Sequence, residues 1–327
     1  MTQTNISSSS APAGVITTGL DVAAETRAFN EELMSQLANQ PALYEATDQA
    51  AAIEAARAGS FTGVPRPRLP HAGDRTVASA AGPVAVRILV PDRVTGVYLH
   101  LHGGGHTLGS AAANDGSLWE LACRTNMATV SVDYRLAPEH PYPAAPDDAE
   151  RAALWLAEHA RSEFGTDRLA VGGDSAGAHL AVVALLRLRD RHEISGAYRA
   201  AYLNSGSYDM SMTPSARQIG DGPLLVNAPL LRWFRQQFLP GLSGEELRDP
   251  DISPLFADLT GMPLARFVAG TQDHAIDDAM FMAARWRAAG SPAQLEIVAE
   301  AVHGFTLFPI TIAQRELERQ YAFLNAA

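Results

Sequence analysis

The segment Arg168-Leu-Ala-Val-Gly-Gly-Asp-Ser-Ala-Gly-Ala-His-Leu180 decides the fold. Its apolar residues Leu169-Ala-Val171 have the character of a buried strand, and a helical pattern follows over about residues 176–191. Between the two, Gly173-Asp-Ser-Ala-Gly177 matches G-x-S-x-G, in which the serine stands on a sharp turn from strand to helix. The pattern predicts Ser175 as a nucleophile. A chance match in a glycine-rich loop is the alternative that this segment alone leaves open.

A second glycine-rich segment, His102-Gly-Gly-Gly105, follows the strand-like Val97-Tyr-Leu-His-Leu101. Three glycines let the backbone approach a substrate carbonyl closely and present N–H groups to its oxygen. A phosphate-binding loop is the competing interpretation, but the segment lacks G-x-G-x-x-G and the chain contains no lysine. We therefore expect an oxyanion hole formed by the N–H groups of Gly104, Gly105 and Ala176.

Apolar strand patterns alternate with helical patterns over most of the chain. The alternation predicts an α/β fold, with a mainly parallel sheet covered by helices on both faces. The expected strands lie at 84–90, 97–101, 128–132, 169–171, 200–203, 266–269 and 295–298, and the expected helices near 115–125, 147–162, 176–191, 276–289 and 311–325.

Changes in composition along the chain predict its division into segments. We expect a disordered tail over residues 1–18 and helices of a cap over 19–60, the second of them starting near residue 42. The catalytic domain is then 61–327, after a proline-rich linker at 63–70. An insertion at about 208–250, with a helical pattern at 228–238, is too long for a bare loop and predicts a further part of the cap.

Composition excludes several classes of protein. The 327 residues carry a net charge of −11, and the basic residues are all arginines without an obvious cluster, which is unfavourable for binding a nucleic acid. No run of about 18 apolar residues predicts a membrane span, and no secretory signal pattern is seen, so a cytoplasmic protein is expected. With one cysteine, and with three glycines between His102 and His106, no metal site is expected.

Several motifs together resemble the hormone-sensitive-lipase-like family of α/β-hydrolases, in its bacterial esterase branch. They are His102–Gly105, Gly173–Gly177 and Asp133-Tyr-Arg-Leu-Ala-Pro-Glu-His-Pro-Tyr-Pro-Ala-Ala-Pro146, and Asp249–Pro254 and His303–Phe305 extend the match. The resemblance covers residues 75–327. It implies an α/β-hydrolase fold with a mainly parallel eight-stranded sheet and a helical cap. It also implies hydrolysis of short-chain esters without a cofactor and, by analogy, a homodimer.

The order of the catalytic groups in α/β-hydrolases is serine, acid, histidine. Of the ten histidines, four follow Ser175: His179, His192, His274 and His303. His303 comes a few residues after the last strand pattern and before Gly304-Phe305, which matches the family's catalytic position. The resemblance therefore assigns His303 as the general base.

The acid has three candidates after the strand at 266–269. Asp273 comes first in the loop, as in the family, whereas Asp277 and Asp278 suit the first turn of the next helix. The family usually has Asp-Pro-Leu-x-Asp here, and this chain has Asp273-His-Ala-Ile-Asp277. We expect Asp273 to be the acid, with Asp277 and Asp278 as open alternatives, and His274 to lie in a surface turn.

The pocket wall is assigned to one polar residue and four apolar ones. His106 follows the glycine loop where the family often has an aromatic or aliphatic residue, which predicts a more polar wall. The apolar candidates, each of which could instead belong to the core of the cap, are Leu225, Trp233, Phe234 and Phe305.

The function expected from these residues is hydrolysis of a small carboxylic ester, with short acyl chains, through an acyl-enzyme on Ser175. A lactonase or a deacetylase of a specific metabolite would use the same chemistry. A ligand receptor on an inactive hydrolase scaffold is the alternative from a different class, and it is disfavoured because candidates for all three catalytic groups are present.

Overall fold

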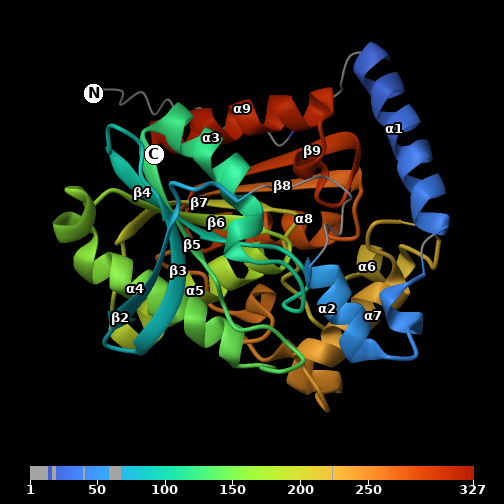
Figure 1. The fold of residues 1–327 in the computed structure, drawn as a ribbon, viewed down its shortest axis with the longest axis horizontal. Helices are drawn as coiled ribbons and strands as arrows, with labels where there is room; N and C mark the ends of the chain where they lie inside the picture. The colour runs from blue at the N-terminus through green and yellow to red at the C-terminus, as the bar shows by residue number, and fades with distance from the viewer. Residues whose placement is uncertain (1–13, 17–19, 40, 59–67, 223) are drawn as a thin grey trace, which may run out of the picture.

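The centre of the molecule is one twisted, mainly parallel sheet. The computed structural model describes residues 14–16, 20–39, 41–58, 68–222 and 224–327, and in them the strand order is β1-β9-β8-β7-β6-β4-β5-β3-β2 (Figure 1). Neighbours from β1 to β5 in this order are parallel, whereas β3 runs antiparallel to β5 and β2 antiparallel to β3. The bounds are β1 Gly14–Ile16, β2 Gly73–Ser79, β3 Gly82–Leu89, β4 Gly96–Leu101, β5 Met127–Val132, β6 Leu169–Asp174, β7 Tyr198–Asn204, β8 Leu264–Gln272 and β9 Ala293–Val302.

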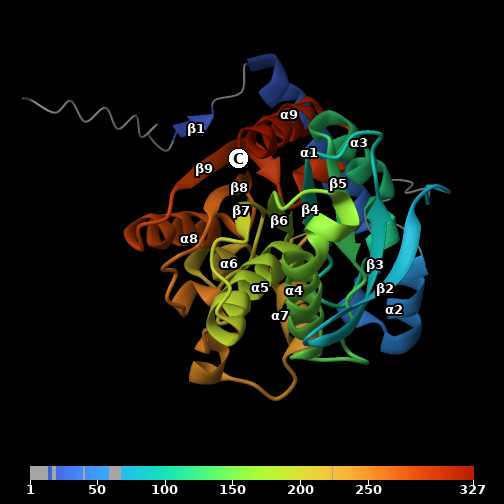
Figure 2. The same ribbon diagram turned by 90° about the vertical axis from the view of Figure 1, so that its left-hand side faces the viewer.

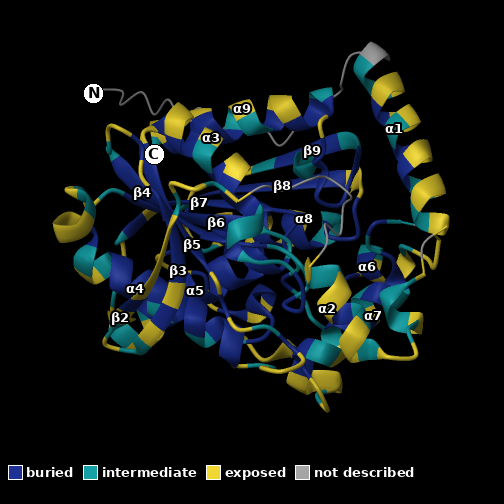
Figure 3. Cartoon of the chain, viewed as in Figure 1, coloured by how far each residue is buried: buried dark blue, intermediate teal, exposed yellow. Residues whose placement is uncertain are grey.

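Helices cover both faces of the sheet, as Figure 2 shows. On one face lie α4 (Ala144–Phe164), α5 (Ala176–His192) and α8 (Ile276–Ala288); on the other lie α1 (Leu20–Ala38), α3 (Asp115–Thr125) and α9 (Thr311–Ala326). β4 and β5 are buried at every residue, because both of their faces are covered (Figure 3). None of the helices in the described part of the chain is long and apolar enough to cross a membrane.

A small cap lies at one end of the molecule, where α2 (Gln49–Ala58), α6 (Pro214–Gln218) and α7 (Ala228–Phe238) gather (Figure 1). Ile53 of α2 packs with Trp233 and Phe234 of α7 in a separate apolar cluster. The indole Nε1 of Trp233 donates to Gln49 Oε1 at 2.8 Å. The insertion therefore joins the N-terminal segment in one roof. Its remaining short helices are η3 (Gly244–Arg248) and η4 (Pro254–Phe256), and the other 3-10 turns of the chain are η1 (Leu43–Glu45), η2 (Ala111–Asn114) and η5 (Phe305–Leu307).

The predicted fold class is confirmed, and each of the seven expected strands has a counterpart. β2 completes the expected eight, and its mostly exposed, polar sequence explains why no strand was expected there. β1 is a ninth strand in the described residues, and it lies within the stretch expected to be a disordered tail. β1 pairs with the outer edge of β9, whose main-chain groups would otherwise have no strand beside them. The rest of 1–18, and most of the expected linker, lies outside the described residues.

The N-terminal helices divide between two places. α1 packs along β9 and α9, where the Phe29 and Phe308 rings lie 5.0 Å apart, and so it belongs to the wall of the main domain rather than to the cap. α2 is the helix that joins the cap. It starts at residue 49 instead of 42, because the Asp48 carboxylate accepts from Ala51 N at 3.0 Å and so caps the helix there.

Candidate active site

The candidate catalytic residues all follow the carboxyl ends of strands. Ser175 follows β6, Asp273 follows β8 and His303 follows β9, while the loop 102–105 follows β4. Carboxyl ends of parallel strands meet at the same edge of a sheet, which is where ligands bind in α/β proteins. The topology therefore brings together residues that are distant in the sequence, such as Ser175 and His303, which lie 128 positions apart.

Ser175 stands on a strained turn between β6 and α5. Its backbone has φ 55° and ψ −117°, a left-handed region that non-glycine residues rarely adopt. The turn needs two glycines because a Cβ on Gly173 or Gly177 would overlap the carbonyl oxygen of Leu101. The Ser175 N–H donates to the Asn204 carbonyl at 2.8 Å, which ties the turn to β7. Strain held in this way is typical of functional turns.

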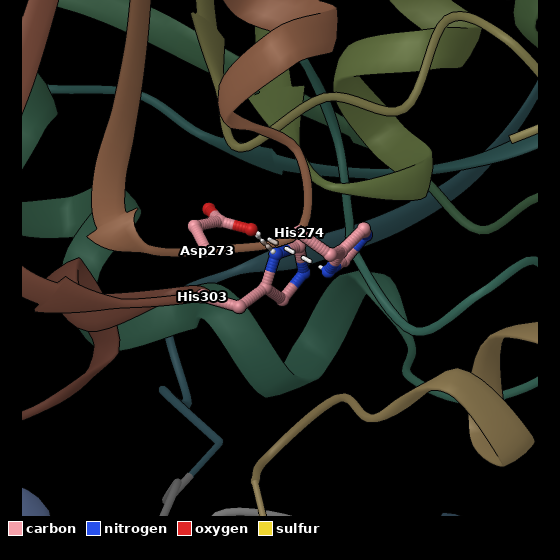
Figure 4. A group of neighbouring side chains, drawn as sticks. All are labelled: Asp273, His274 and His303. Atoms are coloured by element: carbon pink, nitrogen blue, oxygen red, sulfur yellow. Dashed lines mark hydrogen bonds and ion pairs between the residues drawn. The ribbon is translucent and has the colours of Figure 1, made fainter. Parts of the chain in front are cut away.

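Three side chains form a continuous chain of hydrogen bonds. His303 Nε2 lies 2.9 Å from Ser175 Oγ. On the other side of the ring, His303 Nδ1 lies 2.8 Å from Asp273 Oδ1 (Figure 4). Burial alone would raise the pKa of the Asp273 carboxyl, but the charge and hydrogen bond of His303 hold it well below its usual value. Asp273 is therefore ionised at neutral pH and fixes the orientation of the His303 ring.

The other two acid candidates bind the cap segment instead. Asp277 Oδ2 accepts from Ser215 N at 2.7 Å. Asp278 accepts from the N–H groups of Tyr208 and Asp209 and from the Thr213 hydroxyl, at 2.6 to 2.9 Å. Both carboxylates thus hold residues 208–215 against the start of α8, as expected of first-turn residues.

The glycine loop lies directly beside Ser175. Gly104 and Gly105 have φ values of 119° and 59°, and a Cβ on Gly105 would overlap the ring of Phe234. The His102 ring stacks on Tyr134 with centroids 4.1 Å apart, and the Tyr134 hydroxyl donates to the His102 carbonyl at 2.7 Å, so this pair braces the loop. Ala176 is the first residue of α5, so its N–H has no acceptor within the helix.

Two cavities open on either side of Ser175. The first, which we call the Ser207 cavity, measures about 80 Å³ and is lined by Ser207, Met210, Phe238, His274 and Ala176 among others. The second, the His303 cavity, measures about 130 Å³ and is lined by His303, Leu307, Leu225 and the loop 102–105 among others. Gly105, Ser175, Val226 and Phe234 line both. Ser175 thus has room for one substrate group on each side.

Comparison with known proteins agrees with this architecture. Residues 98–307 match the family described as alpha/beta hydrolase fold. The chain belongs to this family. It is 36% identical over 241 residues to the carboxylic ester hydrolase LipN of Mycobacterium tuberculosis, covering 71% of this chain and 63% of LipN. It is 35% identical over 245 residues to the esterase LipI of the same organism, covering 71% of this chain and 74% of LipI.

The structural neighbours point to the same branch of the family. A hormone-sensitive lipase from a metagenome library superposes with a TM-score of 0.77 and 25% identity, covering 92% of this chain and 98% of that one. The expected relationship to hormone-sensitive-lipase-like esterases is therefore confirmed, and with it the class of ester-hydrolysing enzymes to which this α/β-hydrolase is related.

The expected wall residues of this α/β-hydrolase separate into two groups. Phe234 lines both cavities, His106 the Ser207 cavity and Leu225 the His303 cavity. Trp233 and Phe305 line neither: Trp233 packs against α2, and Phe305 is completely buried in the core beneath α9. The structure thus places these two side chains in neighbouring apolar layers and not at the two cavities.

His106 contributes less polarity than expected. Its ring stacks on Phe238 with centroids 3.8 Å apart, and its Nε2 lies 3.1 Å from His179 Nδ1. Burial, together with the neighbouring histidines, holds the pKa of His106 well below its usual value. The imidazole is therefore uncharged at neutral pH and acts mainly as a flat wall.

Two polar residues of the site were not expected. His274 is buried rather than in a surface turn, because the chain bends inward after Asp273, where Ala275 N donates to Asp273 Oδ1 at 2.9 Å. Ser207 follows β7 and lies 3.3 Å from His274 Nε2. The signal that could have found Ser207 is its place just after the end of a parallel strand.

Asp278 gives this α/β-hydrolase a pH-dependent stability. Burial raises the pKa of Asp278 to about 7, although hydrogen bonds from Tyr208, Thr213 and Asp209 oppose the shift. Folding therefore takes up a proton between the ordinary carboxyl pKa of 3.8 and about 7, and the contribution of this group to stability declines as pH rises through that window.

The variant Asp278→Asn tests this pH dependence. Asparagine does not titrate and can accept the same backbone N–H groups. We expect the free energy of unfolding of Asp278→Asn, relative to wild type, to increase by more than about 1 kcal/mol from pH 5 to pH 8. Urea unfolding at both pH values measures this, and a constant difference would contradict it.

Proposed function

We propose that this chain is a serine carboxylesterase that hydrolyses short-chain acyl esters through an acyl-enzyme on Ser175. The observation that carries the proposal is the hydrogen-bonded chain from Ser175 through His303 to the buried Asp273, between two small cavities. It needs no cofactor, because the nucleophile, the base and the donors to the oxyanion all come from the chain itself.

The first half of the reaction acylates the serine. His303 Nε2 takes the proton of Ser175 Oγ as the oxygen attacks the ester carbonyl, and the new charge is held by the N–H groups of Gly104, Gly105 and Ala176. The carbon–oxygen bond to the alcohol then breaks, and the leaving oxygen takes the proton from His303. The result is an ester of Ser175 and a free alcohol.

The second half regenerates the enzyme. A water molecule gives a proton to His303 Nε2 and attacks the acyl carbon through the same oxyanion intermediate. The Ser175 oxygen leaves and recovers the proton, and the carboxylic acid departs. Asp273 stays ionised throughout and stabilises the His303 imidazolium in each half.

The position of His303 supports a division of the substrate between the two cavities. The leaving alcohol must receive its proton from His303, so the alcohol half belongs in the His303 cavity, and the acyl chain belongs in the Ser207 cavity. At about 80 Å³ the Ser207 cavity is smaller than the cavity of about 150 Å³ that accepts a benzene molecule. A chain of a few carbons fits it, which supports the short-chain preference.

Two alternatives use the same site differently. In a lactonase, the alcohol and acyl halves of the substrate would belong to one ring. An assay that compares the hydrolysis of lactones with that of simple esters would reveal this activity. A non-catalytic receptor would need an incomplete catalytic set, whereas here the three side chains are within hydrogen-bonding distance of each other in series. That geometry favours the enzyme.

The chain-length profile tests the proposed substrate class. With nitrophenyl esters from acetate to laurate, we expect kcat/KM to fall steeply beyond about eight carbons. Phe234→Ala should raise the laurate-to-butyrate ratio of kcat/KM by about tenfold or more, because removing the ring joins the two cavities. Phe256→Ala is the matched control, since Phe256 is 38% exposed. A flat profile in the wild type, or an equal change in both variants, would contradict this assignment.

A further inference from the structure

A second serine–histidine pair lies in the Ser207 cavity beside the catalytic residues. His274 Nε2 lies 3.3 Å from Ser207 Oγ, and both residues line the cavity. The His274 ring lies 4.5 Å from the His303 ring between centroids, and Figure 4 shows the two imidazoles next to the same carboxylate. The pair is therefore close to the reacting centre but outside the hydrogen-bonded chain of Ser175, His303 and Asp273.

His274 has hydrogen-bonding capacity that the described part of the chain does not use. It is 2% exposed, and its Nδ1, although 3.4 Å from Asp273 Oδ1, makes no hydrogen bond with the described residues. Burial and the neighbouring His303 lower the pKa of His274 to about 3, so the ring is neutral. Its Nε2 is 3.3 Å from Ser207 Oγ, and the pair borders the cavity next to the apolar side chains of Met210 and Phe238. Polar atoms at such a wall are costly to bury unless a ligand there pairs with them.

We propose that Ser207 and His274 bind a hydroxyl group on the acyl half of the substrate, so that the preferred substrates are esters of short hydroxy acids. The inference rests on the proposed esterase function, and it names the substrate class of that site. A hydroxyl both donates and accepts, so it can pair with Ser207 Oγ and the neighbouring imidazole in either tautomer of His274. An unsubstituted alkyl chain would cover the pair and leave it without a partner.

The rest of the cavity limits the substrate further. Its apolar wall includes Met210, Met212 and Phe238, and its volume of about 80 Å³ suits an acyl group of about four carbons. The cavity therefore has room for the hydroxyl but for little else.

The charges around the cavity favour a neutral acyl group. Asp209 lines it and opposes a carboxylate on the substrate. Arg235 also lines it and forms no ion pair with the residues that the structure describes. A substrate carboxylate bound by Arg235 is the competing outcome, and the test must include it.

The test compares ethyl esters that differ only in the acyl chain. Ethyl butyrate, ethyl 2-hydroxybutyrate, ethyl 3-hydroxybutyrate and monoethyl succinate are assayed by titration of the released acid. For the wild type, we expect kcat/KM for one of the hydroxy esters to exceed that for ethyl butyrate by about tenfold or more. Ser207→Ala should reduce this ratio to about one. His274→Leu should reduce it similarly, even if it also slows every ester through its contact with His303.

The control and the opposing outcomes separate this inference from the proposed function. Ser215 lies on α6 outside both cavities, so Ser215→Ala should keep the wild-type ratio of kcat/KM between the hydroxy ester and ethyl butyrate. A wild type that hydrolyses ethyl butyrate as well as both hydroxy esters overturns the inference and leaves the esterase function standing, whatever the variants do. A preference for monoethyl succinate that Arg235→Ala removes also overturns it. A well-folded wild type that hydrolyses none of the four esters, nor a nitrophenyl ester, overturns both.

Discussion

Ser175→Ala is expected to lower kcat for ester hydrolysis by a factor of about 10⁴ or more. The side chain is the only hydroxyl within hydrogen-bonding distance of His303 Nε2 in the described part of the chain. Without it no acyl-enzyme forms, and only the oxyanion donors and the cavities remain to assist a water molecule. Alanine keeps the Cβ that the turn already accommodates, so the strained backbone at φ 55° need not change.

The measurement combines a rate with a covalent label. Hydrolysis of nitrophenyl butyrate gives the rate, and an organophosphonate followed by mass spectrometry of the digested protein identifies the labelled serine. The wild type and Ser215→Ala should both carry the label on Ser175, and Ser175→Ala should carry none. A label on Ser207 would show that the neighbouring pair supplies the nucleophile, and activity near the wild-type value in Ser175→Ala would exclude the proposed mechanism.

The core of the fold was predictable because its strands and helices show their burial in the local pattern of apolar residues. Strands such as β4 and β5 are buried on both faces and are therefore nearly continuous apolar runs, which the sequence shows directly. The edges carry no such signal. β2 has one buried residue, Val77, among exposed ones, and β1 exists through main-chain pairing with β9. A pattern of side chains cannot reveal a strand whose side chains face solvent or whose stability comes from its partner's edge.

The candidate site was predictable where a motif fixes the backbone. Ser175 and the glycine loop depend on glycines at positions where a Cβ would overlap another chain segment, and glycine is visible in the sequence. The direction of a side chain in an irregular turn is not visible. His274 follows Asp273 directly, and only the bend of that turn decides whether its ring meets solvent or the cavity. Phe305 illustrates the reverse case, since a short turn after His303 directs it into the core.

Asp273→Asn is expected to reduce kcat by about 10⁴-fold while leaving the fold intact. Asp273 Oδ1 accepts from His303 Nδ1 at 2.8 Å and from Ala275 N at 2.9 Å. Asparagine can still accept from the backbone, so the turn should hold. Its amide N–H groups favour the ring tautomer in which His303 Nδ1 accepts and Nε2 carries the proton. That tautomer cannot take a proton from Ser175, and no carboxylate remains to stabilise the imidazolium.

Asp277→Asn decides between the acid candidates and serves as the matched control. Its carboxylate accepts from Ser215 N on the cap, and asparagine can make the same bond, so nitrophenyl butyrate hydrolysis should stay within a few-fold of wild type. Thermal unfolding of both variants checks that any loss of rate is not a loss of fold.

His274 also lies beside Asp273, so a change at Asp273 could affect both the overall rate and the preference for hydroxy esters. Asp273→Asn should slow the butyrate and hydroxybutyrate esters by similar factors, since it acts on the base common to both. The opposite result, in which Asp277→Asn loses the activity and Asp273→Asn keeps it, would contradict the assignment. Asp277 would then be the catalytic acid and would have to reach His303 through a rearranged turn, and the hydrogen bond between Asp273 and His303 would be structural.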